Sequence, residues 1–307
     1  MNKTILITGG SGLIGKILTS MLLQKGYLIH HLSRNPELHA NPKIKIFKWD
    51  VGKNEIDENC IDGVETIIHL AGEGIAEKRW TASRKEQIIK SRTDSIEMIY
   101  NLLHRKQGHQ VKNIIASSAI GFYGDRRNET LTEESQAGSG FLTESCIVWE
   151  KAVDKGKSHE FRIVKLRTGV VLSAAGGALP EMAAPIKKGF GSPLGNGEQW
   201  ISWIHIHDAA KMYIFALENE KLTGTYNMVS PNQVTNKVFT ETLASVFGKK
   251  IWLPHVPAIG LKLLMGEMSA LVLDSAKVSA TKILAEGFKF EYSVLDNSLK
   301  EIYSDRN

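Results

Sequence analysis

The stretch ILITGGSGLIG, residues 5–15, decides the fold of this chain. It places Gly9, Gly12 and Gly15 in a GxxGxxG pattern directly after a strand-like run and directly before a helix-like one. Each glycine has a physical reason, because a tight turn, a close approach to a pyrophosphate and close helix–strand contact all exclude a side chain. The helix that follows offers free N–H groups to phosphates. The stretch therefore predicts a dinucleotide-binding turn.

Strand-like and helix-like segments alternate from this turn to Leu172, which predicts an α/β fold: a Rossmann-type, doubly wound parallel sheet. Beyond Leu172 the chain is rich in Gly and Pro and later mostly helical. A loop of that length inside a compact domain is usually functional. We expect an NAD(P)-binding Rossmann domain of residues 1–172 plus 203–230. The remainder, residues 173–202 plus 231–307, would form a small, mostly helical C-terminal substrate domain, or lid.

The end of the second expected strand bears on the choice of cofactor. In an NAD-binding chain a carboxylate there usually holds the ribose 2′-hydroxyl. This strand ends in Ser33 and Arg34, and a guanidinium suits the 2′-phosphate of NADP(H). The other interpretation of Arg34 is a surface arginine at a loop start. Asp50 and Val51 would meet the adenine edge, and the small-residue turn HLAG, residues 69–72, would run beneath the cofactor.

Composition limits the class of protein. The chain has 307 residues, of which 42% are hydrophobic and 23% charged, and a net charge of +5 that is spread along its length. We therefore expect a full core and no nucleic-acid partner, with lysine pairs such as 187–188 on solvated faces. Cys60 and Cys146 form no CxxC or zinc pattern, which fits a reducing cytoplasm. No stretch reaches the ~18 apolar residues that span a bilayer, so we expect a cytoplasmic protein with no membrane partner.

Together these motifs resemble the extended, epimerase-like type of short-chain dehydrogenase/reductase. More narrowly, the chain resembles the atypical YfcH-like branch of the NAD(P)-dependent epimerase/dehydratase family. The resemblance covers nearly the whole chain and rests on TGGSGLIG, HLAG, SSAIGFYGD, LRTGVVL and HIHDAA, and for the branch on HLAGEGIAEKRW, CIVWEKA and GNGEQWISWIHIHD. It implies an NAD(P) cofactor and a small-molecule substrate. By analogy with the fold, helices near residues 81–106 and 139–156 would pair in a homodimer.

The family's catalytic tyrosine and lysine are missing. Anchoring the motif on Ser145 and Glu150 places the lysine position at Cys146 and the tyrosine position at Leu142. A leucine carries no proton. A thiol has an ordinary pKa of ~8.5, so Cys146 could ionise beside Arg92, which holds the position of the family's asparagine. The other interpretation of Cys146 is a small buried hydrophobe.

Several further side chains are candidates for the site. Ser118 holds the family's serine position, although strict spacing lands on Ala119, and Tyr123 is the nearest tyrosine. Arg167 could meet a phosphate or brace the lid, and Trp200 could stack on a ring or simply pack in the lid. The catalytic candidates are Ser118, Cys146 and Tyr123. The cofactor-binding candidates are Gly9, Gly12, Leu13, Ile14, Gly15, Ser33, Arg34, Asp50, Val51, Leu70, Ala71, Gly72, Arg92 and Arg167. The substrate-binding candidates are Glu73, Ser118, Gln199, Trp200 and Trp203.

No metal site is expected. His205 and His207 alternate along a strand and so share a face, but no third ligand accompanies them. Asp208 is expected to begin or cap the next helix.

Two functions remain open from the sequence. The first is an NADP(H)-binding, epimerase-like oxidoreductase without the usual tyrosine–lysine pair, whose substrate is a nucleotide sugar or another small hydroxylated metabolite. The second is a non-catalytic NADPH-binding regulatory or scaffold protein. The missing pair favours the second, whereas the retained substrate linker favours the first.

Overall fold

The computed structural model describes residues 3–36 and 44–304. Within these residues an eight-stranded sheet has the order β12-β8-β6-β5-β1-β2-β3-β4. All neighbours pair in parallel except β3 and β4. The strands are β1 Thr4–Thr8, β2 Leu28–Ser33, β3 Ile44–Asp50, β4 Glu55–Ile56, β5 Val64–His69, β6 Asn113–Ala119, β8 Arg162–Thr168 and β12 Gly224–Met228. The predicted Rossmann-type fold class is confirmed.

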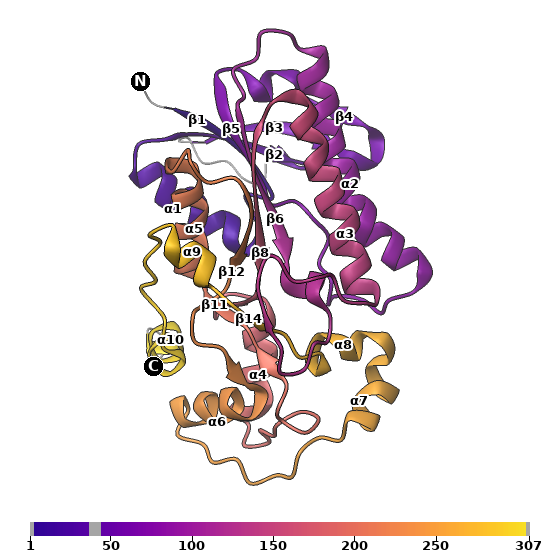
Figure 1. Ribbon diagram of the computed structural model, residues 1–307, viewed down its shortest axis with the longest axis vertical. Helices are drawn as coiled ribbons and strands as arrows, with labels where there is room; N and C mark the ends of the chain where they lie inside the picture. The colour runs from indigo at the N-terminus through magenta and orange to yellow at the C-terminus, as the bar shows by residue number, and fades with distance from the viewer. Residues whose placement is uncertain (1–2, 37–43, 305–307) are drawn as a thin grey trace.

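Long helices cover both faces of this sheet (Figure 1). Helices α1 (Leu13–Gln24) and α5 (Ile206–Glu218) contact each other on one face, and α2 (Ala82–Arg105) and α3 (Phe141–Asp154) contact each other on the opposite face. The helix expected at residues 81–106 is α2. Each face of the sheet is therefore covered by a helix pair.

The alternation of side chains along β1 explains the two layers. Ile5 and Ile7 point into the hydrophobic core beneath α1 and α5, and Leu6 points into the core beneath α2 and α3. Successive strand residues face opposite sides of a sheet, so a strand that is apolar throughout demands cover on both sides. Burying each such side chain stabilises the fold by about 2 kcal/mol.

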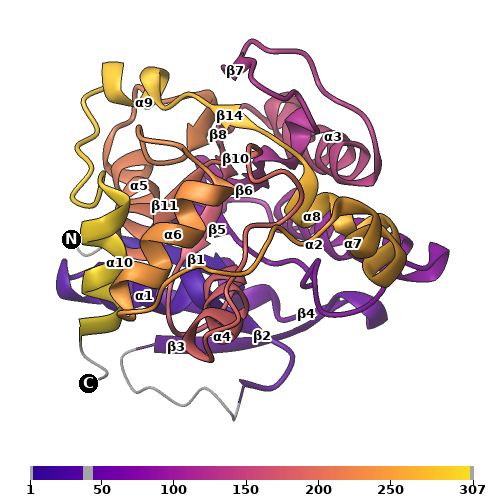
Figure 2. The same cartoon turned by 90° about the horizontal axis from the view of Figure 1, so that it is seen from below.

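Smaller elements make up residues 173–202 and 231–304, the predicted lid, which Figure 2 shows from below. Strand β9 pairs with β11 and β10 pairs with β13, and a third pair, β7–β14, ties residues 130–131 to the C-terminal part of the chain. These short strands are β7 Thr130–Leu131, β9 Val170–Leu172, β10 Trp200–Ile201, β11 Trp203–His205, β13 Val234–Thr235 and β14 Lys277–Val278. The remaining helices are α4 Ala178–Lys187, α6 Asn236–Val246, α7 Ala258–Met265, α8 Ala270–Leu273, α9 Thr281–Ala285 and α10 Leu295–Ser304. The 3-10 helices are η2 Val51–Lys53, η3 Glu58–Ile61, η4 Ile120–Tyr123, η5 Lys155–His159 and η6 Gly266–Ser269.

The C-terminal part of the chain packs in two places. Val278, Ile283 and Phe288 belong to the same hydrophobic core as α5 and β12. Leu299 and Tyr303 of α10 pack instead with α4 and α6 in a third core. The last helices therefore fasten the lid to the sheet, and the division of the chain into two domains stays a prediction.

Candidate functional site

The turn between β1 and α1 leaves no room for side chains. Gly9 has a φ of +69°, and the N–H of Gly12 donates to its carbonyl oxygen at 3.0 Å. A Cβ on Gly15 would lie 2.3 Å from that oxygen, and one on Gly10 would lie 2.4 Å from Nε2 of His31. Helix α1 then begins without a side-chain cap and without an acidic residue in its first turn. Its first N–H groups are thus available to an anion.

A directional chain of hydrogen bonds supports the HLAG turn. Thr8 Oγ1 accepts from the backbone N–H groups of residues 70 and 71, both at 3.1 Å, so its own hydrogen goes to Nδ1 of His69 at 2.9 Å. Nε2 of His69 then donates to Ser95 Oγ at 3.2 Å, which donates to the carbonyl oxygen of Arg92 at 3.1 Å. Burial lowers the pKa of His69 to about 4, so the ring is neutral and has one tautomer. This series of hydrogen bonds joins β1, the HLAG turn and α2.

The expected determinants of NADP(H) binding lie at the ends of β2 and β3. Ser33 Oγ accepts the N–H of Asn35 at 3.2 Å, and Arg34 between them is exposed. Asp50 caps the short helix η2 through a backbone N–H at 3.3 Å, and Val51 beside it is half-buried against the core under α2. The Asp50 carboxylate is thus engaged in its own loop, whereas the Arg34 side chain is exposed.

Two arginines organise the segment after the HLAG turn. Arg84 donates from Nη1 to Oε2 of Glu73 and from Nη2 to the carbonyl oxygen of Gly74, both at 2.7 Å. The hydrogen bond from Arg84 holds the pKa of Glu73 below its ordinary value. Arg92 donates from Nη2 to the carbonyl oxygen of Glu73 at 3.0 Å, and its guanidinium lies 5.0 Å from the ring centre of Trp149. The result is an ionised carboxylate with a fixed cation beside it.

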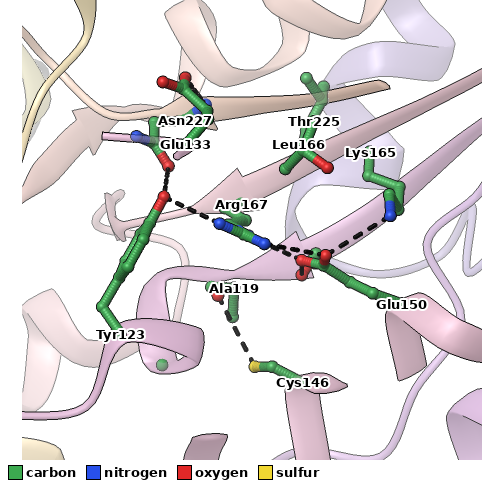
Figure 3. A network of polar contacts seen from close by, with 12 residues as sticks. Ala119, Tyr123, Glu133, Cys146, Glu150, Lys165, Leu166, Arg167, Thr225 and Asn227 are labelled. Carbon is green, nitrogen blue, oxygen red and sulfur yellow. Dashed lines mark hydrogen bonds and ion pairs between the residues drawn. The ribbon is translucent and has the colours of Figure 1, made fainter. Parts of the chain in front are cut away.

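A buried polar network lies beneath α3 (Figure 3). Glu150 accepts from Arg167 on both oxygens, at 2.8 and 3.0 Å, and from Ser118 Oγ at 2.7 Å. Lys165 Nζ lies 3.5 Å from Oε2 of the same carboxylate. Burial alone would raise the pKa of Glu150, but the hydrogen bonds and charge of Arg167 outweigh burial and hold that pKa below its ordinary value. Glu150 is therefore an ionised group within the core.

The network continues from Arg167 to Tyr123. Arg167 Nη1 donates to the Tyr123 hydroxyl at 3.0 Å, which donates to Oδ1 of Asn227 at 2.7 Å (Figure 3). The guanidinium also lies 3.4 Å from the ring centre of Phe122. Tyr123 is fully buried, and burial raises its pKa. The polar groups expected to meet ligands at Ser118, Tyr123 and Arg167 thus satisfy one another, because buried charges and hydroxyls require partners.

Cys146 is a neutral donor in this structure. Its Sγ donates to the carbonyl oxygen of Ala119 at 3.6 Å. Burial raises the pKa of the thiol to about 12, and the positive charge of Arg92 offsets only part of that increase. Its burial and raised pKa favour the interpretation of Cys146 as a small buried hydrophobe, and ionisation of the thiol stays a prediction. Leu142, at the tyrosine position, packs against the turn at Gly121, where a Cβ would lie 3.2 Å from the Leu142 Cβ.

Trp203 does not reach a substrate cleft. Its ring is fully buried in the lid core, and Nε1 donates to the carbonyl oxygen of Asn232 at 2.9 Å. The structure thus contradicts the expected substrate contact, because no part of the side chain is accessible. Strand β11 pairs with β9 and directs this ring inward.

Gln199 and Trp200 hold the linker to the rest of the lid. Gln199 is buried, and its Nε2 donates to the carbonyl oxygens of Leu194 and Val272, both at 3.0 Å. Trp200 is half-buried, with Nε1 donating to Asn128 at 2.9 Å and Lys277 Nζ at 4.4 Å from its ring centre. Substrate contact by these two side chains stays a prediction.

The expected alternation of His205 and His207 along one strand is wrong, because β11 ends at His205 and His207 lies in α5; His205 has a structural role. His205 caps α5, its Nε2 lies 2.9 Å from Oε2 of Glu301, and its ring stacks on Tyr292 at 3.9 Å. Asp208 is not the cap, because its carboxylate accepts the N–H groups of Glu291 and Tyr292. Within residues 3–36 and 44–304, no group of three or more His, Cys, Asp or Glu side chains could hold a metal ion. None of the helices in those ranges has the length and apolar character that crossing a bilayer requires.

Several partners in the core are not predicted by the sequence patterns. Glu150 was expected only to set the register of α3, and no predicted site included Arg84, Lys165 or Asn227. A signal existed for one of them: Lys165 and Arg167 are two residues apart in an apolar strand-like run and therefore face the same side. Two cations on one face of a buried strand indicate a buried acid opposite them.

Known proteins resemble this chain along its whole length. The model of the NAD dependent epimerase/dehydratase family matches residues 5–228, and that of a domain of unknown function, DUF1731, matches residues 256–302. Epimerase family protein YfhF of Bacillus subtilis is 35% identical over 303 residues, which cover 98% of each chain. Epimerase family protein SAR0825 of Staphylococcus aureus is 33% identical over 306 residues, covering 98% of this chain and 99% of the relative.

Two solved structures extend the likeness. The human epimerase family protein SDR39U1 (isoform 2), solved with NADPH, has a TM-score of 0.85 and 27% identity over 98% of this chain and 99% of that one. A nucleoside-diphosphate sugar epimerase from Corynebacterium glutamicum has a TM-score of 0.79 and 31% identity. The match covers 98% of this chain and 58% of that protein, so the present chain corresponds to little more than half of it.

Proposed function

The chain belongs to the NAD dependent epimerase/dehydratase family, and we propose that it is an NADP(H)-dependent oxidoreductase acting on a small hydroxylated metabolite or its carbonyl form. The glycine turn carries the proposal. Side chains at Gly10 and Gly15 would collide with His31 and with the Gly9 backbone, so the turn can pack in this tight form only with glycine at both positions. A turn of this shape before an uncapped helix fits the pyrophosphate of a dinucleotide.

We assign parts of the cofactor to residues of this chain. The pyrophosphate would lie on the N-terminus of α1 at Gly12, Leu13 and Ile14, and the 2′-phosphate would pair with the exposed Arg34. The backbone of residues 70–72, supported by the Thr8–His69 hydrogen bond, would pass beneath it. When bound, the nicotinamide supplies or accepts a hydride. The human relative solved with NADPH supports NADP(H) over NAD(H).

Arg92 is proposed to provide the charge that the family's lysine provides. At the lysine position Cys146 is neutral, because its pKa is about 12. Arg92 is a cation that lies directly against the HLAG turn, since a Cβ on Gly72 would be 3.2 Å from its Cζ. A guanidinium held there by the Glu73 carbonyl can bind ribose hydroxyls or a developing negative charge on a substrate oxygen.

The state of the three positions where an acid or base would be expected favours a second candidate function, one without catalysis. The Cys146 thiol is protonated and buried, Tyr123 is fully buried with a raised pKa, and position 142 is a leucine. None of these three positions offers an acid or base that exchanges protons near neutral pH. This observation supports a non-catalytic NADPH-binding regulatory or scaffold protein.

The deciding experiment separates cofactor binding from turnover. NADPH and NADH are titrated against the protein by nucleotide fluorescence, with Gly15→Ala as a non-binding control. The near-ultraviolet absorbance of NADPH is then followed with nucleotide sugars, sugar aldehydes, ketones and polyols. The sugar-nucleotide class is included because the relative from C. glutamicum is named for it. Hydride transfer to any of these supports the enzyme; tight NADPH binding without transfer supports the regulatory protein; failure to bind NADPH refutes both.

We also propose a cytoplasmic homodimer. The two cysteines are unpaired and buried, which suits a reducing compartment. Pairing would use the outer faces of α2 and α3, where Val148 is 41% exposed. Light scattering of the purified protein, compared with a Val148→Arg variant, tests this assembly: a wild-type monomer refutes it.

A further inference from the structure

Two segments of the lid that are distant in the sequence lie side by side. They are residues 187–195, at the end of α4, and residues 249–264, which lead into and include most of α7; we call them the basic lid face. Trp252 Nε1 donates to the carbonyl oxygen of Gly189 at 3.1 Å. The N–H of Val256 donates to Pro193, and the N–H of Gly195 donates to Val256, both at 2.9 Å. These hydrogen bonds join the loop after α4 to the loop that leads into α7.

This face exposes an unusual amount of apolar surface. Phe190 is 63% exposed, Trp252 69%, Ile259 75%, Leu263 80% and Leu264 72%. They are five of the ten exposed large hydrophobic side chains within the described residues. Single exposed apolar residues are ordinary, but their concentration in two paired segments marks an interaction surface.

The charges of the basic lid face have one sign. Neither segment contains an aspartate or glutamate. Lys188, Lys249, Lys250 and Lys262 are exposed, and none of them forms an ion pair with a described residue. Lys187 is engaged elsewhere, because its Nζ lies over the ring of Phe247 at 4.8 Å. Lysines without an ion pair thus lie beside both exposed aromatic residues and within α7.

Helix α7 is held in place from behind. Arg79 Nη2 donates to the carbonyl oxygen of Leu264 at 2.6 Å, and Lys85 of α2 forms an ion pair with Glu267 just beyond the helix. Leu261 is buried on the inner side. The outward side of α7 is therefore presented by a supported element, at the lid end of the molecule in Figure 1.

We propose that the basic lid face binds reversibly to the surface of an anionic lipid bilayer. The exposed aromatic and aliphatic side chains would enter the boundary between headgroups and acyl chains, and the lysines would meet lipid phosphates. A bilayer fits better than a nucleic acid, because Ile259, Leu263 and Leu264 offer neither stacking nor hydrogen bonds to bases. A homodimer contact through this face is disfavoured, because its two-fold symmetry would bring like-charged lysines together.

A surface contact of this kind differs from a membrane-spanning segment. The expectation of no membrane partner came from the lack of a spanning segment, and a surface contact needs none. The proposal also does not depend on the proposed function, because no residue of the basic lid face is assigned to cofactor or hydride chemistry.

Vesicle co-sedimentation of the full-length protein tests the proposal. Phosphatidylcholine vesicles are compared with vesicles containing about one-third phosphatidylglycerol, at about 50 mM and about 500 mM salt. The protein is expected to bind the anionic vesicles at low salt, with Trp emission shifted to shorter wavelength. Lys249→Glu plus Lys250→Glu should weaken the partition constant at least about twentyfold, because each lysine contributes about fivefold. Phe190→Ala plus Trp252→Ala should weaken it and abolish the emission shift.

Matched variants make the result decisive. Lys112→Glu plus Lys289→Glu reverses two exposed lysines elsewhere, and Leu28→Ala plus Leu284→Ala removes two exposed apolar side chains elsewhere; neither pair should change binding. Equal effects of the control and test pairs would overturn the proposal, as would no binding to anionic vesicles. Preferential binding to DNA or to an acidic peptide over vesicles would assign the face to a different partner. All variants are checked for NADPH binding and melting temperature.

Discussion

Arg167 and Glu150 meet in the core as a two-point ion pair, with Nε to Oε1 at 2.8 Å and Nη2 to Oε2 at 3.0 Å. They are only 4% and 7% exposed, so neither charge can turn to water if the other is lost. They come from β8 and α3, and the pair therefore fixes this helix on the sheet.

Replacing one member of the Arg167–Glu150 pair should lower the free energy of unfolding far more than replacing both. We expect Arg167→Met to lower the free energy of unfolding by about 3–5 kcal/mol, because it leaves a buried carboxylate less well compensated. The double variant Arg167→Met plus Glu150→Leu should recover much of that loss. Urea denaturation measures both, with Arg126→Gln as a partly exposed control. A double variant as unstable as the sum of its single changes would contradict this account.

The free energy of unfolding should decrease as the pH is lowered, because of His69. Burial lowers the pKa of this ring to about 4 in the folded chain, against about 6.5 when unfolded. The unfolded chain therefore binds a proton that the folded chain refuses, and stability is lost as pH falls from about 6.5 toward about 4, by roughly 3 kcal/mol. Urea denaturation across this range should show a shallower slope for His69→Gln. Replacing the exposed His159 by Gln should leave the slope unchanged.

A methyl group at Gly15 should weaken cofactor binding. The Cβ of Gly15→Ala would lie 2.3 Å from the backbone oxygen of Gly9, which cannot move without opening the turn. We expect NADPH affinity to fall more than tenfold, with reduced stability of roughly 1–3 kcal/mol. Gly260→Ala is the matched control, because a Cβ there would meet nothing within 4 Å. Wild-type NADPH affinity in Gly15→Ala would refute the assigned phosphate site.

Arg34 should distinguish the two nicotinamide cofactors. Replacement by Ala removes a charged partner of the 2′-phosphate and should weaken NADPH binding by roughly 10- to 100-fold, in line with about 1.5–3 kcal/mol for a charge-assisted hydrogen bond. NADH affinity should stay within about twofold, because NADH lacks that phosphate. Fluorescence titration of both nucleotides provides the ratio. Equal losses for NADPH and NADH would show that Arg34 supports the fold rather than the phosphate.

Both cysteines should resist alkylation in the folded protein. Burial raises the pKa of Cys60 and of Cys146 to about 12, so at pH 8 the thiolate fraction is about 10⁻⁴. Intact-mass spectrometry after iodoacetamide treatment should show no adduct until denaturant is added, and then two. Rapid native labelling at Cys146 would restore the thiolate hypothesis. Unchanged NADPH affinity of Cys146→Ala would confirm that the thiol is not needed for binding.

The catalytic candidates show which features of the site can be predicted from sequence patterns. The family's spacing predicts that Leu142 and Cys146 replace its acid–base pair; the structure places both positions on one helix, α3, and the replacement itself stays a prediction. The same spacing gave no account of Ser118, Tyr123 and Arg167, whose partners are 32, 104 and 17 residues away. Partners this far apart in the sequence cannot be predicted from patterns among neighbouring residues.

Read alone, the amino-acid sequence was sufficient for the α/β class, the glycine turn and the family, because strand period, helix period and glycine spacing are properties of neighbouring residues. The roles of Glu150, Arg167 and Trp203 emerged only with the assembled sheet and lid. A buried charge is stable only beside an opposite charge, and an aromatic ring is hidden only when another layer covers it. Both conditions depend on which distant segments the fold brings together.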